Sequence, residues 1–197
     1  MRTVSTTFVA RASALSTPGS DSCRIRAHCS IRKFHRVRIW DRNVDKASRL
    51  AQTLDDILPA VEAAAGIEAA VGDADLVSSA SPADAPPILG AWLSPGTHLD
   101  LKGGFTPDIR ETDNDAVCRC TVFVDQRDGA AADAVDIADP LAREILGKDG
   151  VAADLFDLCR GRHPGRQQSQ ETTLFKSNGT GLEDLAAARL AFESSTG

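Results

Sequence analysis

The stretch VRIWDRNVDKASRLAQTLDDIL, residues 37–58, decides the fold class. Its first four residues predict a short strand that ends at Asp41, and Asn43 is a residue type that caps the start of a helix. After Asn43, apolar residues recur at steps of three and four, which predicts an amphipathic helix. These residues are Ala47, Leu50, Ala51, Leu54 and Leu58. A strand followed by a helix is the unit from which α/β proteins are built.

Further strand and helix candidates alternate along the rest of the chain. Strands are expected at residues 60–63, 76–80, 97–102, 121–124 and 172–175, and helices at residues 23–34, 67–71 and from residue 182 onward. Most of these strands end in small or polar residues, as expected where strand ends line a ligand crevice. The alternation predicts an α/β domain with a Rossmann-like, doubly wound, mostly parallel sheet.

The turn before the last helix is a candidate ligand site. Ser177, Asn178 and Gly179 follow a strand, and Thr180 and Glu183 have the T-x-x-E spacing of a capping box. Free backbone N–H groups at a helix N-terminus suit an anion or a cofactor amide. Capping by Thr180 explains the same residues, so both readings stay open.

The beginning of the chain departs from the pattern of a dinucleotide-binding fold. No G-x-G-x-x-G motif is present, and only Pro18-Gly19-Ser20 precedes the first predicted helix. We therefore expect residues 1–22 to be an irregular segment and residues 23–197 to form an incomplete Rossmann domain without its first strand and glycine-rich loop. The first strand is central in such sheets, so residues 6–10, a weak strand candidate, would have to fill the gap.

The composition of the chain limits the kinds of partner that we expect for this protein. The 197 residues suit one domain, and the net charge of −6 argues against nucleic acid as a main partner. Seven basic residues lie between Arg24 and Arg42 with Asp41 as the only acid, which indicates a solvated basic face or an anion-binding edge. No apolar run approaches the ~20 residues of a membrane span.

Cysteine usage and the first twenty residues bear on localisation. Five cysteines without paired CxxC spacing favour reduced thiols in a cytoplasmic protein over a zinc site. Residues 1–20 contain Arg2 and Arg11, many Ser and Thr, and no acid, which leaves an organelle transit peptide as an alternative.

Individual residues offer candidate chemistry. Asp41 closes a strand where an acid can accept hydrogen bonds from the hydroxyls of an adenosine ribose, although acids also occur there as solvated caps. Arg42 could meet a 2′-phosphate or simply be exposed. His98 and Asp100 share one face of a strand. The sequence offers no further ligands for a metal there, so a structural role is favoured, as is packing for Cys118 and Cys120.

Several ordered segments resemble the ornithine cyclodeaminase/mu-crystallin family. They are Ile39-Trp40-Asp41-Arg42, Asp73-Ala74-Asp75-Leu76-Val77-Ser78, Pro95-Gly96-Thr97-His98-Leu99-Asp100, Gly104-Phe105-Thr106-Pro107-Asp108 and Phe175-Lys176-Ser177-Asn178-Gly179. Their order and spacing match from about Ile25 to the C-terminus. The resemblance implies an N-terminally truncated chain, because the family's N-terminal substrate and dimerisation domain is absent from the sequence.

The resemblance also implies roles for individual residues and a cofactor, NAD or NADP. It places Asp41 at the ribose, Ser81 in the loop after a strand, Lys102, Gly103 and Gly104 under the nicotinamide side, Ser177 near the ring, and Asn178 at the substrate. Arg42 beside Asp41 completes the set of cofactor-binding candidates. No catalytic residue is assigned, since Phe105 stands where cyclodeaminases carry an acid/base aspartate and Ile109 where they carry a lysine.

Phenylalanine cannot relay a proton, which disfavours cyclisation of ornithine to proline with loss of ammonia. The Gly-Phe-Thr-Pro pattern is similar to the subgroup that reduces cyclic imines such as Δ1-pyrroline-2-carboxylate with NAD(P)H. The expected ligand is therefore a cyclic imine or an amino acid, with activity impaired in this isolated chain. A non-catalytic nucleotide-binding remnant and a cyclodeaminase remain the alternatives.

Overall fold

The computed structural model describes residues 7–11, 20–54, 60–81, 83, 85–103 and 109–196. Within them, eight strands form one sheet in the order β3-β2-β1-β4-β5-β8-β6-β7, and every strand pair is parallel. The predicted doubly wound α/β sheet is confirmed. The strands are β1 Thr7–Arg11, β2 Arg36–Trp40, β3 Val61–Ala63, β4 Leu76–Ser79, β5 His98–Leu101, β6 Thr121–Val124, β7 Val151–Asp154 and β8 Thr173–Lys176.

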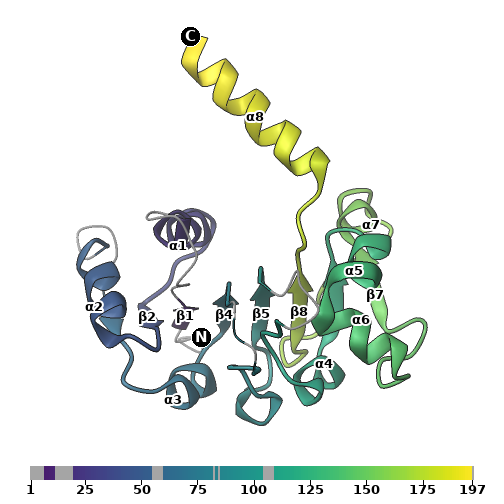
Figure 1. The fold of residues 1–197 in the computed structure, drawn as a ribbon, viewed down its shortest axis with the longest axis horizontal. Coiled ribbons are helices and arrows are strands. Elements are labelled where there is room, and N and C mark those ends of the chain that lie inside the picture. Colours follow the sequence, from purple (N-terminus) through teal and green to yellow (C-terminus); the bar gives the residue numbers. More distant parts are fainter. Residues whose placement is uncertain are drawn as a thin grey trace.

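Helices flank the row of strands on both sides (Figure 1). In this view α1 and α7 lie above the strands, and α3 and α4 lie below them. The helices are α1 Ser20–Ile31, α2 Val44–Gln52, α3 Ile67–Gly72, α4 Asn114–Arg119, α5 Arg127–Asp133, α6 Val135–Ala142, α7 Leu155–Cys159 and α8 Gly181–Thr196, with a short 3-10 turn, η1, at Gly90–Trp92.

The first strand of the sheet is present, which corrects the expectation of a gap. In β1, Thr7 pairs with Arg36 of β2, and Phe8 pairs with Leu76 of β4. The strand and the start of α1 at Ser20 also differ from the irregular segment expected for residues 1–22. Strands β2 and β4 would otherwise each expose an edge of unpaired backbone groups, and this tertiary demand outweighs a weak local propensity. The glycine-poor stretch 12–19 lies outside the described residues.

The two helix caps expected from the sequence are confirmed. Asn43 Oδ1 accepts hydrogen bonds from the backbone N–H groups of Asp45 at 3.0 Å and Lys46 at 3.4 Å. At the start of α8, Glu183 N–H donates to Thr180 Oγ1 and Thr180 N–H donates to Glu183 Oε2, both at 3.3 Å. Local side-chain chemistry therefore fixes where both helices begin.

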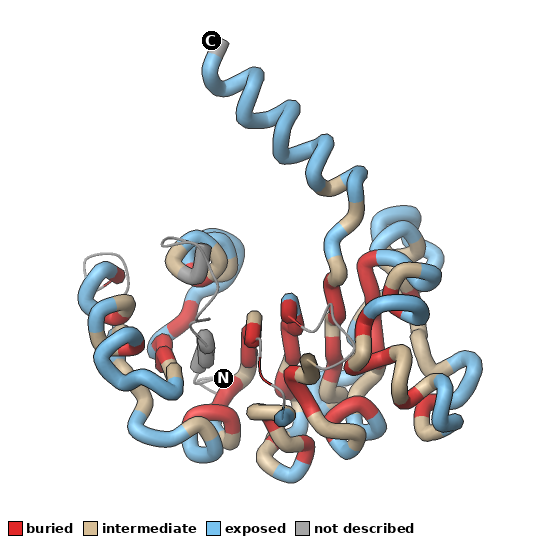
Figure 2. Tube along the Cα trace, in the orientation of Figure 1, coloured by how far each residue is buried: buried red, intermediate tan, exposed pale blue. Residues whose placement is uncertain are grey.

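The core lies in two clusters of buried residues. The larger one joins β4, β5, β6 and β8 to α3, α4 and α6, and the smaller one joins β2 to α1 and α2. Figure 2 shows buried residues concentrated in the central strands β4, β5, β8 and β6. Parallel strands buried on both faces need apolar residues throughout, as in the apolar β6 segment Thr-Val-Phe-Val. The loops at the carboxyl edge of the sheet are therefore attached to strands that are packed into the core.

The segment between β6 and β8 contains elements that the sequence reading did not assign. They are α5, α6, β7 and α7. Helix α6 contains Pro140, a residue that normally signals a helix end. Short alanine- and aspartate-rich helices of this kind carry little periodic signal, and burial of Ile137 against the core specifies α6 instead.

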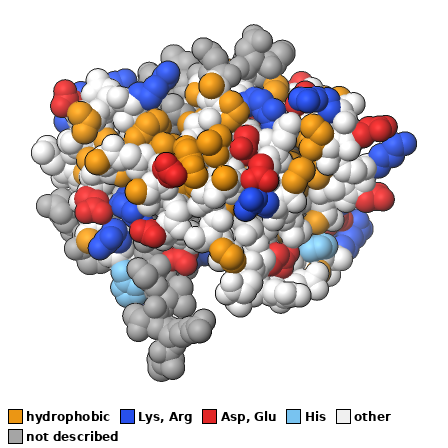
Figure 3. Space-filling view, turned by 90° about the horizontal axis from the view of Figure 1, so that it is seen from below, with side chains coloured by type: hydrophobic (Ala, Val, Ile, Leu, Met, Phe, Trp, Pro, Cys, Tyr) orange, Lys and Arg blue, Asp and Glu red, His pale blue; other side chains and the backbone are white. Residues whose placement is uncertain are grey.

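Helix α8 extends away from the rest of the structure and is exposed along its length (Figures 1 and 2). Its large apolar residues Leu182, Leu185, Leu190 and Phe192 are all exposed. None of the helices in the described part of the chain has the length and apolar character that a membrane crossing requires. Seen from below, the surface has apolar side chains near its middle and interspersed acidic and basic ones, so neither charge sign dominates this face (Figure 3).

Candidate functional site

The candidate site lies at the carboxyl ends of the central strands. From β1 the chain adds β2 and β3 on one side, then crosses to add β4 and β5 on the other, so the strand order reverses between β1 and β4. Such a reversal is where open α/β sheets bind ligands. Asp41, Ser81, Lys102 and Ser177 each follow a strand at this edge, because all the strands are parallel.

Asp41 closes β2 and helps to form the turn into α2. Its Oδ1 accepts a hydrogen bond of 2.7 Å from the backbone N–H of Asn43. The structure gives Oδ2 no partner among the described residues, so one carboxylate oxygen is left for a ligand hydroxyl. Arg42 beside it is exposed.

Ser81 and Gly103, in the loops after β4 and β5, are tied together by Glu111. The Glu111 side chain is fully buried and accepts hydrogen bonds from Ser79 Oγ and Ser81 N–H at 2.7 Å and from Gly103 N–H at 2.5 Å. A Cβ added to Gly103 would lie 2.6 Å from the carbonyl oxygen of Ser81. The two loops therefore touch backbone to backbone. Gly104, the next predicted cofactor residue, lies outside the described residues.

Lys176 supplies the cation that balances this carboxylate. Its Nζ lies 3.4 Å from Glu111 Oε2 and 3.1 Å from Asp136 Oδ2, it donates to the carbonyl of Gly103, and all three charged side chains are 0% exposed. Burial raises the pKa of Glu111, and the charge of Lys176 opposes that rise. Asp136 Oδ1 accepts from the backbone N–H of Glu111 at 2.9 Å. The Gly103 peptide is thus held at its N–H by Glu111 and at its carbonyl by Lys176.

A second polar chain joins the ends of β5, β8 and β6. Lys102 Nζ donates to Ser177 Oγ at 3.1 Å, and Ser177 Oγ lies 3.3 Å from Asp125 Oδ2. The same Asp125 oxygen accepts from the backbone N–H groups of Asn178 and Gly179, each at 2.8 Å. Two predicted cofactor residues, Lys102 and Ser177, are therefore in direct contact, and Asp125 fixes the turn that follows them.

Asn178 points toward α5 in this structure. Its Nδ2 donates to the carbonyl of Gly129 at 3.2 Å, whereas its Oδ1 is buried and has no hydrogen-bond partner in the described part of the chain. A buried acceptor without a donor is costly. A ligand N–H that reached Oδ1 would remove that cost, and the substrate role of Asn178 stays a prediction.

His98 and Asp100 both have structural hydrogen bonds. His98 Nδ1 lies 2.8 Å from Thr173 Oγ1. Asp100 Oδ2 accepts from Ser78 Oγ at 2.8 Å and lies 3.0 Å from His28 Nε2. Burial acts to raise the pKa of Asp100, but the hydrogen bonds from His28 and Ser78 hold it below its ordinary value.

The thiols of Cys118 and Cys120 are both free. Burial raises the pKa of Cys120 to about 12, so this thiol is unreactive at neutral pH. The packing role expected for this residue agrees with that environment.

Sequence reasoning missed the buried charges that support the loops. The sequence patterns assign no role to Glu111, Asp125 or Asp136, and Lys176 stands out only as part of a segment that resembles the family. One signal was present: Lys176 ends an apolar strand segment, where a charged residue must either reach solvent or find a partner. Nothing local pointed to Glu111 or Asp136 as that partner, because 40 and more residues separate them from Lys176 in sequence.

Comparison with known proteins gives consistent matches. A profile of the ornithine cyclodeaminase/mu-crystallin family matches residues 10–197. The chain is 43% identical over 177 residues to an uncharacterized protein of Schizosaccharomyces pombe, which covers 86% of the chain and 54% of that protein. It is 39% identical over 165 residues to a Delta(1)-pyrroline-2-carboxylate reductase of Paracoccus denitrificans, covering 83% of the chain and 52% of the relative.

A solved structure shares the fold over nearly the whole chain. The Delta(1)-pyrroline-2-carboxylate reductase of Thermococcus litoralis, solved with NADH and L-proline, superposes with a TM-score of 0.87 at 25% identity, covering 98% of this chain and 58% of that one. The chain spans about half the length of the curated relatives it matches. On the extent of the family match, this chain belongs to the ornithine cyclodeaminase/mu-crystallin family.

Proposed function

We propose that this chain forms the nicotinamide-dinucleotide-binding part of an NAD(P)H-dependent reductase of cyclic imines such as Δ1-pyrroline-2-carboxylate. The observation that carries the proposal is the convergence of Ser81, Lys102, Gly103 and Ser177 beside the reversal of strand order. The names of the relative from Paracoccus denitrificans and of the complex from Thermococcus litoralis support the same reaction class.

The described residues fit such a cofactor at two places. A Cβ at Gly103 would collide with the backbone of Ser81, so only glycine lets the loops after β4 and β5 pack this closely beside the proposed cofactor crevice. Asp41 keeps one carboxylate oxygen for a ribose hydroxyl. Arg42, adjacent and exposed, is the residue that we assign to a 2′-phosphate if NADP is used. Gly104 belongs to the same proposed set.

The bound dinucleotide would supply the hydride. The protein's part is to position groups: Lys102 donates to Ser177 Oγ, and Ser177 in turn faces Asp125, so the hydroxyl is held in one orientation beside the cofactor crevice. Asn178 Oδ1 is an acceptor that a substrate N–H could satisfy. Reduction of an already protonated C=N demands positioning more than a strong side-chain base.

The test is a titration of the purified chain with NADH and NADPH, followed by tryptophan fluorescence. Trp40 directly precedes Asp41 at the carboxyl edge, whereas Trp92 lies in η1, before β5 begins. We expect saturable quenching with a dissociation constant below about 1 mM, roughly 4 kcal/mol. Trp40→Phe should remove most of the quenching, and Trp92→Phe should leave it in place.

Reduction of Δ1-pyrroline-2-carboxylate is then measured with the cofactor that binds. Oxidation of NADH or NADPH that depends on the imine supports the reductase. A folded chain that binds neither nucleotide contradicts the proposal and leaves a non-catalytic relative. Release of ammonia from ornithine without net oxidation of the cofactor would instead support the cyclodeaminase alternative.

A further inference from the structure

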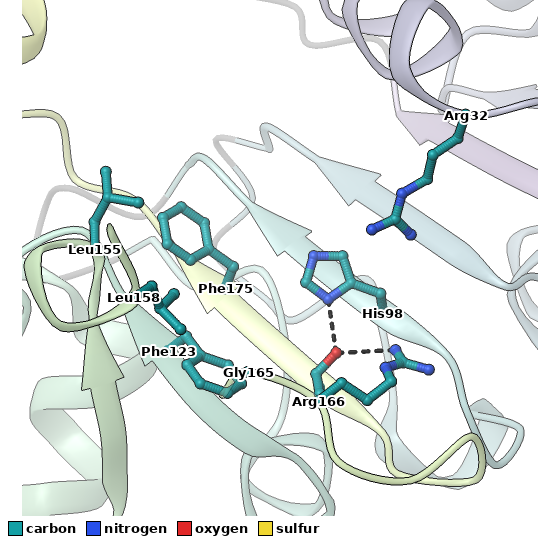
Figure 4. A pocket seen from close by; sticks show the side chains of 9 residues that line it. Arg32, His98, Phe123, Leu155, Leu158, Gly165, Arg166 and Phe175 are labelled. Atoms are coloured by element: carbon teal, nitrogen blue, oxygen red, sulfur yellow. Dashed lines mark hydrogen bonds between the residues drawn. The ribbon is translucent and has the colours of Figure 1, made fainter. Parts of the chain in front are cut away.

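A cavity of about 320 Å³ opens on a face of the sheet, away from the crevice described above (Figure 4). Its walls come from β5, β6 and β8, from α7 and from the residue that follows α1. His98 and Thr173 are the first residues of β5 and β8. From this end of the cavity the crevice begins four residues later, at Lys102 and Ser177, which is about 13 Å at about 3.3 Å per residue, whereas Phe175 at the other end is two residues from Ser177.

At one end of this cavity a hydrogen bond holds the ring of His98 in place. Thr173 Oγ1 lies 3.0 Å from Arg166 Nη2 and 2.8 Å from His98 Nδ1. A guanidinium only donates, so Thr173 Oγ1 accepts from Arg166, and its own hydrogen is available to His98 Nδ1. Burial lowers the pKa of His98 to about 4, so the ring is neutral, and in the tautomer that accepts from Thr173 at Nδ1 its hydrogen lies on Nε2. Figure 4 shows the second ring nitrogen of His98 on the side of the ring away from this hydrogen bond.

The same end carries positive charge that no nearby acid pairs with. Figure 4 shows the guanidinium of Arg32 directed toward His98, and in the described structure it has neither a hydrogen bond nor an ion pair. Of the carboxylates that act on His98 and Arg166, Asp100 and Glu171 are already engaged. Asp100 is held by His28 and Ser78, and Glu171 accepts from Thr121 Oγ1 at 2.7 Å and from backbone N–H groups.

The other end of the cavity is apolar. Phe123, Phe175 and Leu158 line it, and Phe123 is fixed by an edge-to-face contact with the ring of His163 at 5.4 Å between centroids. A volume of about 320 Å³ is at the lower end of the range of small-molecule sites, too small for a dinucleotide. The cavity therefore suits a compact ligand that has one anionic end and one apolar end.

We propose that this cavity binds a small monocarboxylic acid with an aromatic or compact aliphatic body. The carboxylate pairs with the Arg32 guanidinium and accepts from His98 Nε2–H, and the body packs against Phe123 and Phe175. A planar guanidinium matches a planar carboxylate through two parallel hydrogen bonds. The site does not depend on the proposed reductase function, because it shares no residue with the dinucleotide crevice.

The test uses benzoate as the probe and follows the NMR shifts of the full chain at low salt. Arg32→Gln should weaken benzoate binding at least tenfold. Arg26→Gln is the matched control, since Arg26 is an exposed arginine of α1 outside the cavity lining, and it should change the affinity less than twofold. Benzamide, which has the same shape without the charge, should bind at least tenfold more weakly than benzoate.

Two further measurements separate the two ends of the site. Leu158→Ala should weaken benzoate binding and leave the weaker binding of inorganic phosphate unchanged. Saturating NADH should not displace benzoate. Any of four results overturns the proposal: no saturable benzoate binding by the folded chain, equal effects of the two arginine variants, phosphate binding as tightly as benzoate, or displacement by NADH. Failure of NADH to bind at all would contradict only the reductase proposal.

Discussion

Replacing Lys176 with methionine tests whether the buried charge cluster stabilises the loop after β5. Lys176 pairs with Asp136 at 3.1 Å and with Glu111 at 3.4 Å, and all three side chains are fully buried. Among the described residues, it is the only cation that pairs with either acid. Methionine fills a similar volume but leaves two carboxylates facing each other in the interior. Breaking a buried pair in this way costs about 3–5 kcal/mol.

The pH dependence of this loss has a definite sign. Burial already raises the pKa of Glu111 above its ordinary 4.5, so the charged form destabilises the fold. The stability that comes from keeping Glu111 protonated is present below pH 4.5, and it is lost as the pH rises through the raised pKa. Removing Lys176 raises this pKa further. The difference between Lys176→Met and the wild type should therefore widen from pH 5 to pH 8.

Urea denaturation followed by circular dichroism measures both effects. Lys148→Met is the matched control, since Lys148 is exposed and has no ion pair in the described structure, and it should shift the free energy of unfolding by no more than about 0.5 kcal/mol. A loss below about 1 kcal/mol for Lys176→Met, or one that does not change with pH, would refute the account of the cluster.

Three other substitutions probe the cap, the loop contact and the histidine. Asn43→Ala should lower the free energy of unfolding by about 1 kcal/mol, measured by urea denaturation, because α2 loses its cap. Gly103→Ala should lower the free energy of unfolding by about 1–3 kcal/mol and weaken NADH binding, because the added Cβ meets the backbone of Ser81. Gly147→Ala serves as the control, because a Cβ at Gly147 would meet only open space. The pKa of His98 is lowered from 6.5 to about 4, so its neutral form stabilises the fold above pH 6.5 and that contribution is lost as the pH falls toward 4. Thermal unfolding between pH 6.5 and 4 should therefore show a smaller loss for His98→Gln than for the wild type, and equal losses would contradict the assignment.

Much of the fold could be predicted from local patterns. The strand at Thr121–Val124 has the predicted bounds, and the caps at Asn43 and Thr180 form as expected. These features succeed because side-chain type and backbone geometry are coupled within a few residues. Helix α6 could not be predicted in this way because Pro140 lies within it. Its position in the fold depends on packing against the core.

The sequence indicated where the candidate site lies, but it did not indicate the hydrogen bonds that hold the site together. The family resemblance grouped Asp41, Ser81, Lys102 and Ser177 as cofactor residues, and residues that follow parallel strands lie at one edge of the sheet. Their hydrogen-bond partners could not be identified in this way. Asp125 accepts hydrogen bonds from the backbone of Asn178 and Gly179, which lie more than 50 residues later in the sequence. No local sequence pattern predicts a contact between residues so far apart.

The sequence by itself determined the α/β class, the parallel sheet, the starts of α2 and α8 and the resemblance to a family, because periodicity, capping and motif spacing are local or ordered properties. The tertiary structure alone decided that Thr7–Arg11 completes the sheet and that Glu111, Asp136 and Lys176 meet in the interior. A weak strand forms where two neighbours need hydrogen-bond partners, and a charge can be buried only where its counter-charge is brought to it. Both conditions are set by residues distant in sequence.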